Sequence, residues 1–292
     1  MHVFVTGATG WVGSAIVPEL LANGHTVLGL ARSGDSARKL RDVGAEALMG
    51  TLEDLDILRQ GARQCEAIIH AGFIHDFADY AGSAAKDKRA IEAMGEVLRG
   101  TTKPLVVTSG SLAKTDAKQS RVTEKSEAGP HFPRLPTESA TLKLAENGVN
   151  AMILRLAPSV HGQGDGGFVH RLVELAKEKG YVAYVGDGQN RWPAVHRKDA
   201  AVLYRLAIES PAGKVLQGFH DEALRFKVIV EAIGKRLALE VRSIPAAEAE
   251  AYYGWLTFFV TMDAEASSQW TRKTFHWQPK EIGLIEDISR NY

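Results

Sequence analysis

The chain has 292 residues, including 35 basic and 35 acidic ones, so its formal net charge is zero. This length supports one large domain or two joined domains, and a 45% hydrophobic share excludes a mainly disordered chain. Balanced charge argues against a broadly basic nucleic-acid binder, and the single cysteine, Cys65, cannot form an internal disulfide.

The sequence also lacks the usual signals for membranes and metals. No apolar run reaches the ~18–20 residues that cross a bilayer. The start, MHVFVTGATGWVG, has neither the basic n-region nor the apolar h-region of a secretory signal. We therefore expect a cytoplasmic protein that binds a small molecule, with no nucleic-acid or membrane partner and with a homodimer left open. The ten histidines show no metal-ligand spacing, so no metal site is expected.

The first half of the chain alternates apolar strands with helices. We expect strands at Val3–Thr6, Thr26–Ala31, Ala45–Met49, Ala67–Ala71, Leu105–Thr108 and Ala151–Leu156. The helical stretches between them are Ser14–Ala22 (with Pro18 as a poor fit), Asp54–Ala62, Lys86–Leu98 and Pro136–Asn147. Buried strands that alternate with helices predict an α/β fold with a doubly wound parallel sheet.

After Leu156 the pattern becomes less regular and indicates a smaller α+β lobe. The elements expected there are Val169–Lys179, Val182–Val185, Asp199–Glu209, Phe226–Leu237 and Ala246–Gly254, while Thr257–Ser268 is too mixed to assign. We expect residues 1–157 to form a nucleotide-binding domain to which 193–218 returns. Residues 158–192 and 219–292 are expected to form a substrate lobe.

A glycine-rich loop directly follows the first strand and opens the first helix. In Thr6-Gly7-Ala8-Thr9-Gly10-Trp11-Val12-Gly13, Gly7 permits the tight turn and Gly10 lets the backbone approach a pyrophosphate. Gly13 allows the helix to pack closely on the strand, and the helix N-terminus faces the phosphates. The alternative, a glycine-rich turn without a ligand, is disfavoured by the strand before the loop and the helix after it.

The end of the second strand bears on the choice between NAD and NADP. An NAD site places an acid there, whereas this chain has Arg32 followed by Ser33. A guanidinium can bind a 2′-phosphate through paired hydrogen bonds, and the serine adds a hydroxyl, so the sequence favours NADP. The alternative is that Arg32 is only a solvated residue after a strand.

These motifs resemble those of the extended short-chain dehydrogenases/reductases, which are NAD-dependent epimerase/dehydratase-like proteins. TGATGWVG, GTLEDLDILRQ, IIHAG, VVTSGS, ILRLAPSVHG and GDGQNRWPAVHRKDAA follow in family order over roughly Met1–Leu206. The resemblance implies a Rossmann-type domain, a nicotinamide dinucleotide and a C-terminal substrate domain. The cofactor contacts that it implies are Gly7, Thr9, Gly10, Trp11, Val12, Arg32, Thr51, Leu52, His70, Ala71, Gly72, Pro158, Ser159 and Val160.

The chain departs from the family at the catalytic pair. It has no Tyr-x-x-x-Lys, and the interval after the fifth strand instead contains His131-Phe-Pro-Arg134, as in an atypical branch of the family. A histidine can donate a proton at neutral pH, and an arginine can stabilise an oxyanion. We therefore assign His131 as proton donor and Arg134 as its support. The alternative is a solvent-facing loop in which Arg134 pairs with Glu138.

The family's catalytic serine is also displaced. Alignment puts Gly110 at its position, and we favour Ser111 over Ser109 because Ser111 lies beyond the strand. Both serines could simply be turn formers.

Further candidates for the substrate site lie on segments that follow strands or belong to the second lobe. These are Phe73, His75, His161, Phe168 and Trp192. For Phe168 and Trp192, packing in the core between the lobes is slightly favoured over a role in the site. For each histidine, the alternative is a loop residue whose hydrogen bonds are satisfied within the protein.

The function expected from the sequence is an NADP-dependent oxidoreductase that interconverts a carbonyl and an alcohol on a small, fairly apolar molecule. One alternative is an epimerase or dehydratase that recycles its nicotinamide, and another is a non-enzymatic NADP sensor.

Overall fold

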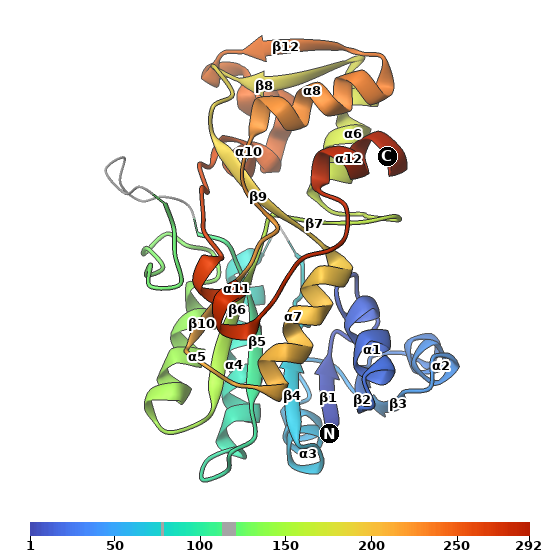
Figure 1. Ribbon diagram of the computed structural model, residues 1–292, viewed down its shortest axis with the longest axis vertical. Helices are drawn as coiled ribbons and strands as arrows, with labels where there is room; N and C mark the ends of the chain where they lie inside the picture. Colours follow the sequence, from blue (N-terminus) through green and yellow to red (C-terminus); the bar gives the residue numbers. More distant parts are fainter. Residues whose placement is uncertain (77–78, 113–120) are drawn as a thin grey trace.

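The computed structural model describes residues 1–76, 79–112 and 121–292, and its centre is a seven-stranded sheet (Figure 1). The order is β10-β6-β5-β4-β1-β2-β3, and every neighbouring pair is parallel. The strands are β1 His2–Thr6, β2 Thr26–Ala31, β3 Glu46–Met49, β4 Ala67–His70, β5 Leu105–Gly110, β6 Ala151–Leu156 and β10 Val215–Gly218. The predicted parallel sheet is confirmed.

Helices cover both faces of this sheet, as the doubly wound prediction requires. Val3 and Val5 of β1 point into one core with helices α1 and α7, whereas Phe4 points into the opposite core with α3, α4 and α5. Successive side chains of a strand face opposite sides, so one strand feeds both cores. The helices are α1 Gly13–Ala22, α2 Gly34–Asp42, α3 Leu55–Gln64, α4 Tyr80–Glu96, α5 Leu135–Glu146 and α7 Arg197–Glu209.

Two of these helices differ from the sequence expectation. α4 begins at Tyr80, ahead of the predicted Lys86, because the small residues of its first turns give no apolar periodicity. α2 was not predicted, since its strongly polar sequence buries only Ala37 and Leu40. Pro18 is accommodated within α1 on an exposed position.

A second lobe lies at the carboxyl edge of the sheet, in the upper part of Figure 1, and has its own apolar core. It contains a three-stranded sheet of order β11-β9-β7 and a parallel pair, β12-β8. Its strands are β7 Ser159–His161, β8 Tyr181–Val185, β9 Arg191–His196, β11 Asp221–Arg225 and β12 Glu240–Ile244. Its helices include α6 Phe168–Lys179, α8 Phe226–Leu237, α9 Ala249–Tyr253, α10 Thr257–Thr261 and α12 Leu284–Asn291, with short 3-10 turns at Ala246–Glu248 and Gly254–Leu256.

The C-terminal segment does not stay within the second lobe. Ala266, Phe275 and Trp277 are buried in the same core as β1 and α1. The sequence had predicted that all of 219–292 would belong to the substrate lobe. Phe275 belongs to helix α11 (Gln269–Phe275), which contacts α7 and β10. Within the part of the chain that the structure describes, no helix is long and apolar enough to span a membrane.

Candidate active site

The glycine loop between β1 and α1 forms a tight backbone cradle. Gly7 has φ +65°, and a Cβ atom there would lie 2.6 Å from the Gly72 nitrogen. A Cβ at Gly13 would lie 2.0 Å from the Gly7 oxygen, while the Gly10 N–H donates to that oxygen at 2.8 Å. Only glycine fits the first and third positions, so the loop has the close strand–helix approach that a dinucleotide-binding turn needs.

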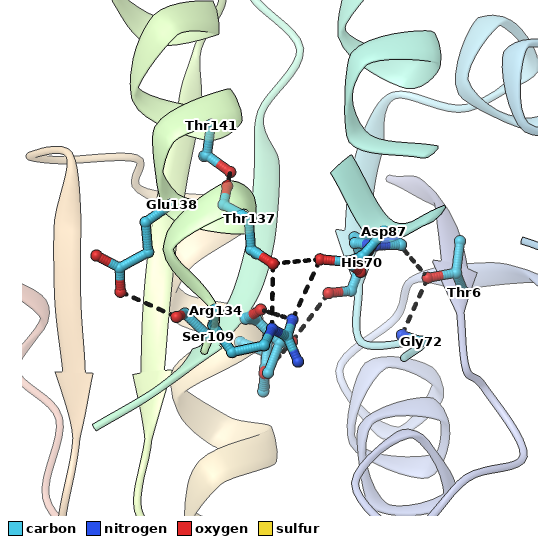
Figure 2. Close-up of polar contacts among 11 residues, drawn as sticks. Thr6, His70, Gly72, Asp87, Ser109, Arg134, Thr137, Glu138 and Thr141 are labelled. Atoms are coloured by element: carbon cyan, nitrogen blue, oxygen red, sulfur yellow. Dashed lines mark hydrogen bonds and ion pairs between the residues drawn. The ribbon is translucent and has the colours of Figure 1, made fainter. Parts of the chain in front are cut away.

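The carboxyl ends of β1 and β4 are joined beneath this loop. The Thr6 hydroxyl bonds the Nδ1 atom of His70 at 2.7 Å and accepts the Gly72 N–H at 3.2 Å (Figure 2). His70 is fully buried, and its Nε2 atom lies 3.0 Å from Asp87. Both ring nitrogens are therefore used inside the protein, and the His70 ring supports the cradle rather than lining its open side.

The loop also contacts the segment that follows β6. The Trp11 indole N–H donates to the Val160 carbonyl at 2.6 Å, and the Arg197 guanidinium lies 4.2 Å from the Trp11 ring centre. Two of the residues expected to bind the cofactor, from distant parts of the sequence, are thus brought together. The neighbouring Ser159 is buried.

Arg32 lies at the carboxyl end of β2 with an exposed side chain, and among the described residues it forms no ion pair. Ser33 caps α2 by accepting the Ser36 N–H at 3.2 Å. Thr51 donates both its amide and its hydroxyl to Asp54 ahead of α3, at 2.7 and 2.8 Å. Arg32 is therefore a cation that is available to a ligand at this end of the cradle.

Arg134 occupies the centre of a buried polar cluster below the ends of β4 and β5. Its Nη2 atom donates to the Thr108 carbonyl at 2.8 Å and lies 3.4 Å from Asp87. Its Nε atom donates to Thr137, whose hydroxyl donates to Asp87 at 2.5 Å. We call His70, Asp87, Arg134 and Thr137 the open cluster, and Figure 2 shows its hydrogen bonds running from α5 across to β4.

The charge state of Asp87 follows from these partners. Burial opposes its ionisation, but the hydrogen bonds from His70 and Thr137 and the charge of Arg134 outweigh that effect and lower the pKa of Asp87. The carboxylate is therefore ionised at neutral pH and fixes the position of the Arg134 guanidinium.

Aromatic side chains cover the guanidinium on its outer side. The Arg134 Cζ atom lies 3.8 Å from the Phe73 ring centre, and the Phe73 ring lies 5.1 Å from His75 and 5.4 Å from Tyr80. The charge of Arg134 opposes the rise that burial causes in the pKa of the Tyr80 phenol. Sequence reasoning placed Phe73, His75 and Arg134 near the chemistry but missed Tyr80 and Asp87, because both come from α4 and belong to no recognisable motif.

The structure contradicts the alternative in which Arg134 pairs with Glu138. Glu138 binds Arg155 through both oxygens, at 2.9 and 2.7 Å, and accepts the Ser109 hydroxyl at 2.9 Å. We call Ser109, Glu138 and Arg155 the closed cluster, since all three side chains are buried. Arg134 lies before α5 begins, so the four-residue spacing does not place it beside Glu138.

The other two residues assigned to catalysis are differently situated. His131 lies on the turn before α5 with an exposed side chain, outside the hydrogen bonds of the open cluster that the structure describes. Ser111 directly follows β5, is buried, and donates its backbone N–H to the Leu156 carbonyl at 2.8 Å. The positions of His131 and Ser111 therefore leave their catalytic roles as predictions.

The candidates in the second lobe are mostly interior residues. Trp192 is fully buried, donates its indole N–H to the Phe259 carbonyl at 2.9 Å and lies 6.1 Å from Phe168. His161 is fully buried, and its Nδ1 atom lies 2.8 Å from Asp287. Core packing therefore describes Trp192, and His161 joins β7 to α12 rather than presenting its ring to an open pocket.

Comparisons with known proteins agree with this architecture. The family model of the NAD dependent epimerase/dehydratase family matches residues 3–217. An uncharacterized protein of Schizosaccharomyces pombe is 46% identical over 99% of this chain and 98% of its own length. The 4-hydroxy-2-methyl-3-oxo-4-farnesyl-3,4-dihydroquinoline-1-oxide ketoreductase of Stigmatella aurantiaca is 26% identical over 99% of this chain and 90% of that protein. A decarboxylating sterol-4-alpha-carboxylate 3-dehydrogenase of Dictyostelium discoideum is 27% identical over 71% and 67%, respectively.

Solved structures show the same fold at low identity. UDP-glucose 4-epimerase of Thermotoga maritima has a TM-score of 0.78 at 18% identity, covering 100% of this chain and 97% of that one. The human epimerase family protein SDR39U1, solved with NADPH, has a TM-score of 0.73 at 17% identity and covers 100% and 99%. With the glycine cradle in place and the family model spanning most of the chain, the protein belongs to the NAD dependent epimerase/dehydratase family.

Proposed function

We propose that the protein is an NADP-dependent oxidoreductase that reduces a carbonyl, or oxidises the corresponding alcohol, on a small and fairly apolar molecule. The observation that carries the proposal is Arg134, a fixed cation beside aromatic rings at the carboxyl edge of the sheet. Ligands of open α/β sheets bind at this edge. A preorganised cation stabilises the negative charge that develops on a carbonyl oxygen during reduction.

The residues of the cradle fit a nicotinamide dinucleotide. The space that a Cβ would fill at Gly7 and Gly13 is already taken by backbone, and the opening of α1 lies next to the loop. Such a turn brings backbone N–H groups close to a pyrophosphate. When bound, the reduced nicotinamide would supply a hydride to the substrate carbon.

The preference for NADP depends on Arg32. Its exposed guanidinium at the end of β2 is free of ion pairs within the described residues, whereas the nearby Arg38 is bound to Asp35 at 2.8 Å. A planar guanidinium that is not paired with a carboxylate can bind a 2′-phosphate through two parallel hydrogen bonds. An NAD site would instead have an acid at this position.

The apolar character of the substrate is supported by two observations. Phe73 covers the guanidinium and packs against Tyr80, so a ligand that reaches Arg134 meets aromatic surface. The names of the Stigmatella and Dictyostelium relatives refer to a farnesyl compound and a sterol, both largely apolar, and to ketoreductase and dehydrogenase activities.

The cofactor assignment predicts a change in nucleotide preference in Arg32→Asp. We expect NADPH to raise the melting temperature of the wild-type protein more than NADH does, and the order to reverse in the variant, because binding to the folded state stabilises it by mass action. Arg63→Asp, which makes the same charge change on an exposed residue at the end of α3, is the matched control.

Turnover is then measured as loss of NADPH absorbance with ketones of increasing apolar size, from acetone through medium-chain methyl ketones to acetophenone. We expect larger apolar ketones to react faster. If none of the four nucleotides NADP, NADPH, NAD and NADH raised the melting temperature, the proposed function would be wrong. An equal response to NADPH in both Arg32→Asp and wild type would contradict the NADP assignment alone.

A further inference from the structure

A second exposed cation, Arg197, lies beside the glycine loop. It is the first residue of α7, and its guanidinium carbon lies 4.2 Å from the ring centre of Trp11, which belongs to the loop. Trp11 is held in place in turn, because its indole N–H donates to the Val160 carbonyl at 2.6 Å. The glycine loop, strand β7 and the start of α7 therefore meet around one indole ring.

The charge of Arg197 is not neutralised where it lies. Within the described residues Arg197 forms no ion pair, and its side chain is only partly buried. Its neighbour Lys198 differs, since the ammonium group of Lys198 lies 3.6 Å from Glu281. The stem of Arg197 also passes close to the chain after β7, because a Cβ atom at Gly162 would lie 3.5 Å from the Arg197 Cγ atom. The guanidinium is thus placed over Trp11 and remains available to an anion.

The adjoining loop presents backbone donors that lack acceptors. The Gly10 N–H donates to the Gly7 carbonyl, but the N–H groups of Trp11 and Val12 donate to no acceptor in the part of the chain that the structure describes. All three of Gly10, Trp11 and Val12 are at least partly exposed. The free N–H groups at a helix N-terminus carry a partial charge of roughly +0.5 in total. They suit phosphate oxygens, but they cannot balance full negative charges alone.

We propose that Arg197 binds the pyrophosphate of the nicotinamide dinucleotide. This inference depends on the cofactor of the proposed function and names a side chain that holds it. Each phosphate of a pyrophosphate carries a negative charge, whereas the loop supplies only partial positive charge. A guanidinium adds a full charge and paired N–H donors, which suit phosphate oxygens.

The position of Trp11 brings the cation to the right group. Trp11 contributes one of the free backbone N–H groups, and its ring lies directly beneath the guanidinium. A phosphate oxygen bound at that N–H is therefore close to the Arg197 side chain, which is long enough to reach it by a small rotation. Arg32 lies instead at the end of β2. The two arginines therefore serve different groups, the 2′-phosphate for Arg32 and the pyrophosphate for Arg197.

This division of roles gives a test that needs no turnover. Isothermal titration calorimetry measures the affinity for NADPH and for NADH, which share the pyrophosphate. We expect Arg197→Met to weaken both nucleotides by the same factor, about 10- to 100-fold, as for the loss of a hydrogen bond to a charged group. Arg197→Lys keeps the charge without the planar guanidinium, so its affinity should lie between those of Arg197→Met and the wild type.

Lys198→Met is the matched control, because it removes a positive charge from the next residue, which already has an acidic partner. An equal loss of affinity in Lys198→Met would reduce the effect to net charge and overturn the proposal. A loss in Arg197→Met that is confined to NADPH would assign Arg197 to the 2′-phosphate and would overturn it as well.

The salt dependence of binding separates a direct contact from support of the loop. Salt screens an ion contact, so the affinity of the wild type for NADPH should fall more steeply with NaCl than that of Arg197→Met. Arg197 acting only through its packing on Trp11 would change the melting temperature of the free protein and leave the two slopes parallel. Parallel slopes would therefore contradict the contact.

The failure of this inference can be told from failure of the proposed function. If the wild type binds neither nucleotide, the proposed function itself fails. If the wild type binds both and Arg197→Met binds them equally well, only the present inference fails. Should Arg197→Met lack a cooperative thermal transition, Arg197→Lys takes its place, and an affinity equal to that of the wild type at every NaCl concentration then counts against the paired contact.

Discussion

The open and closed clusters are built from the same parts but differ in how completely the arginine is buried. Both combine an arginine, a carboxylate and a hydroxyl beside the ends of the central strands. In the closed cluster the Arg155 and Glu138 side chains are each 2% exposed and bind through two bonds at 2.9 and 2.7 Å. In the open cluster the Arg134 side chain is 10% exposed, and its contact with Asp87 is 3.4 Å long.

This difference fits the roles that we propose, in which Arg155 stabilises the fold and Arg134 takes part in the chemistry. Arg155 directs its guanidinium entirely into the protein, so that ion pair can only support the structure. Arg134 instead meets Asp87, Thr137 and Thr108 on its inner side and the Phe73 ring on its outer side.

The largest effect is expected in the closed cluster. Glu138→Ala leaves the Arg155 charge buried without its carboxylate, which should lower the free energy of unfolding by about 3–5 kcal/mol. Urea denaturation measures this loss. The double variant Glu138→Leu/Arg155→Met removes both charges and should recover most of it, whereas a single variant as stable as the wild type would show that the pair does not support the fold.

A smaller and pH-dependent effect is expected in the open cluster. The lowered pKa of Asp87 means that the folded state binds its proton less readily than the unfolded state, so the stabilisation is present at neutral pH. We expect Asp87→Asn to cost about 1.5–3 kcal/mol at pH 7, as for hydrogen bonds to a charged group. The pKa of an aspartate in the unfolded chain is about 4. As the pH falls below this value and through the lower pKa of Asp87 in the folded state, the difference in the free energy of unfolding between the variant and the wild type should shrink.

Parallel urea denaturation at neutral and acidic pH tests this expectation. A difference between Asp87→Asn and wild type that stayed constant over the whole range would contradict an ionised Asp87.

The smallest effect should separate the two clusters by activity rather than stability. Ser109→Ala and Thr137→Val each remove a hydroxyl that bonds a buried carboxylate, and each should cost about 1 kcal/mol. Only Thr137→Val loosens Arg134, so only this variant should lower the rate of ketone reduction. Equal rates in the two variants would mean that the placement of Arg134 does not limit the reaction.

The sequence predicted the sheet and the cradle well because both rest on local signals. The apolar strands, the glycines and the order of strand, loop and helix are all read within a few residues, and β2, β6 and α8 have the predicted bounds. Phe73 was found because it follows a strand end, where a parallel sheet gathers its functional side chains. Arg134 was found because His131-Phe-Pro-Arg134 stands in the interval where the resembled family has its catalytic pair.

The rest depends on contacts that no short segment of the sequence contains. Tyr80 begins α4 and Asp87 lies about two turns later. The partners of Asp87 come from β4 and from the start of α5, and Tyr80 packs against Phe73. The sequence also suggested that Arg134 could pair with Glu138, four positions later. The helix begins only after Arg134, and each side chain instead finds a partner on another element.

The path of the chain between the two cores limits how the molecule can be divided. After β6 the backbone leaves the first core and enters the second with α6, β8 and β9, and it then returns to the first core with α7 and β10. It enters the second core again with α8, crosses back to place Phe275 and Trp277 in the first, and closes the second core with α12. Any continuous fragment that contains one core whole therefore also contains part of the other. We infer that neither lobe folds when it is expressed alone, and that neither can be replaced by the corresponding lobe of a related protein. We also infer that heating unfolds both lobes in a single cooperative transition.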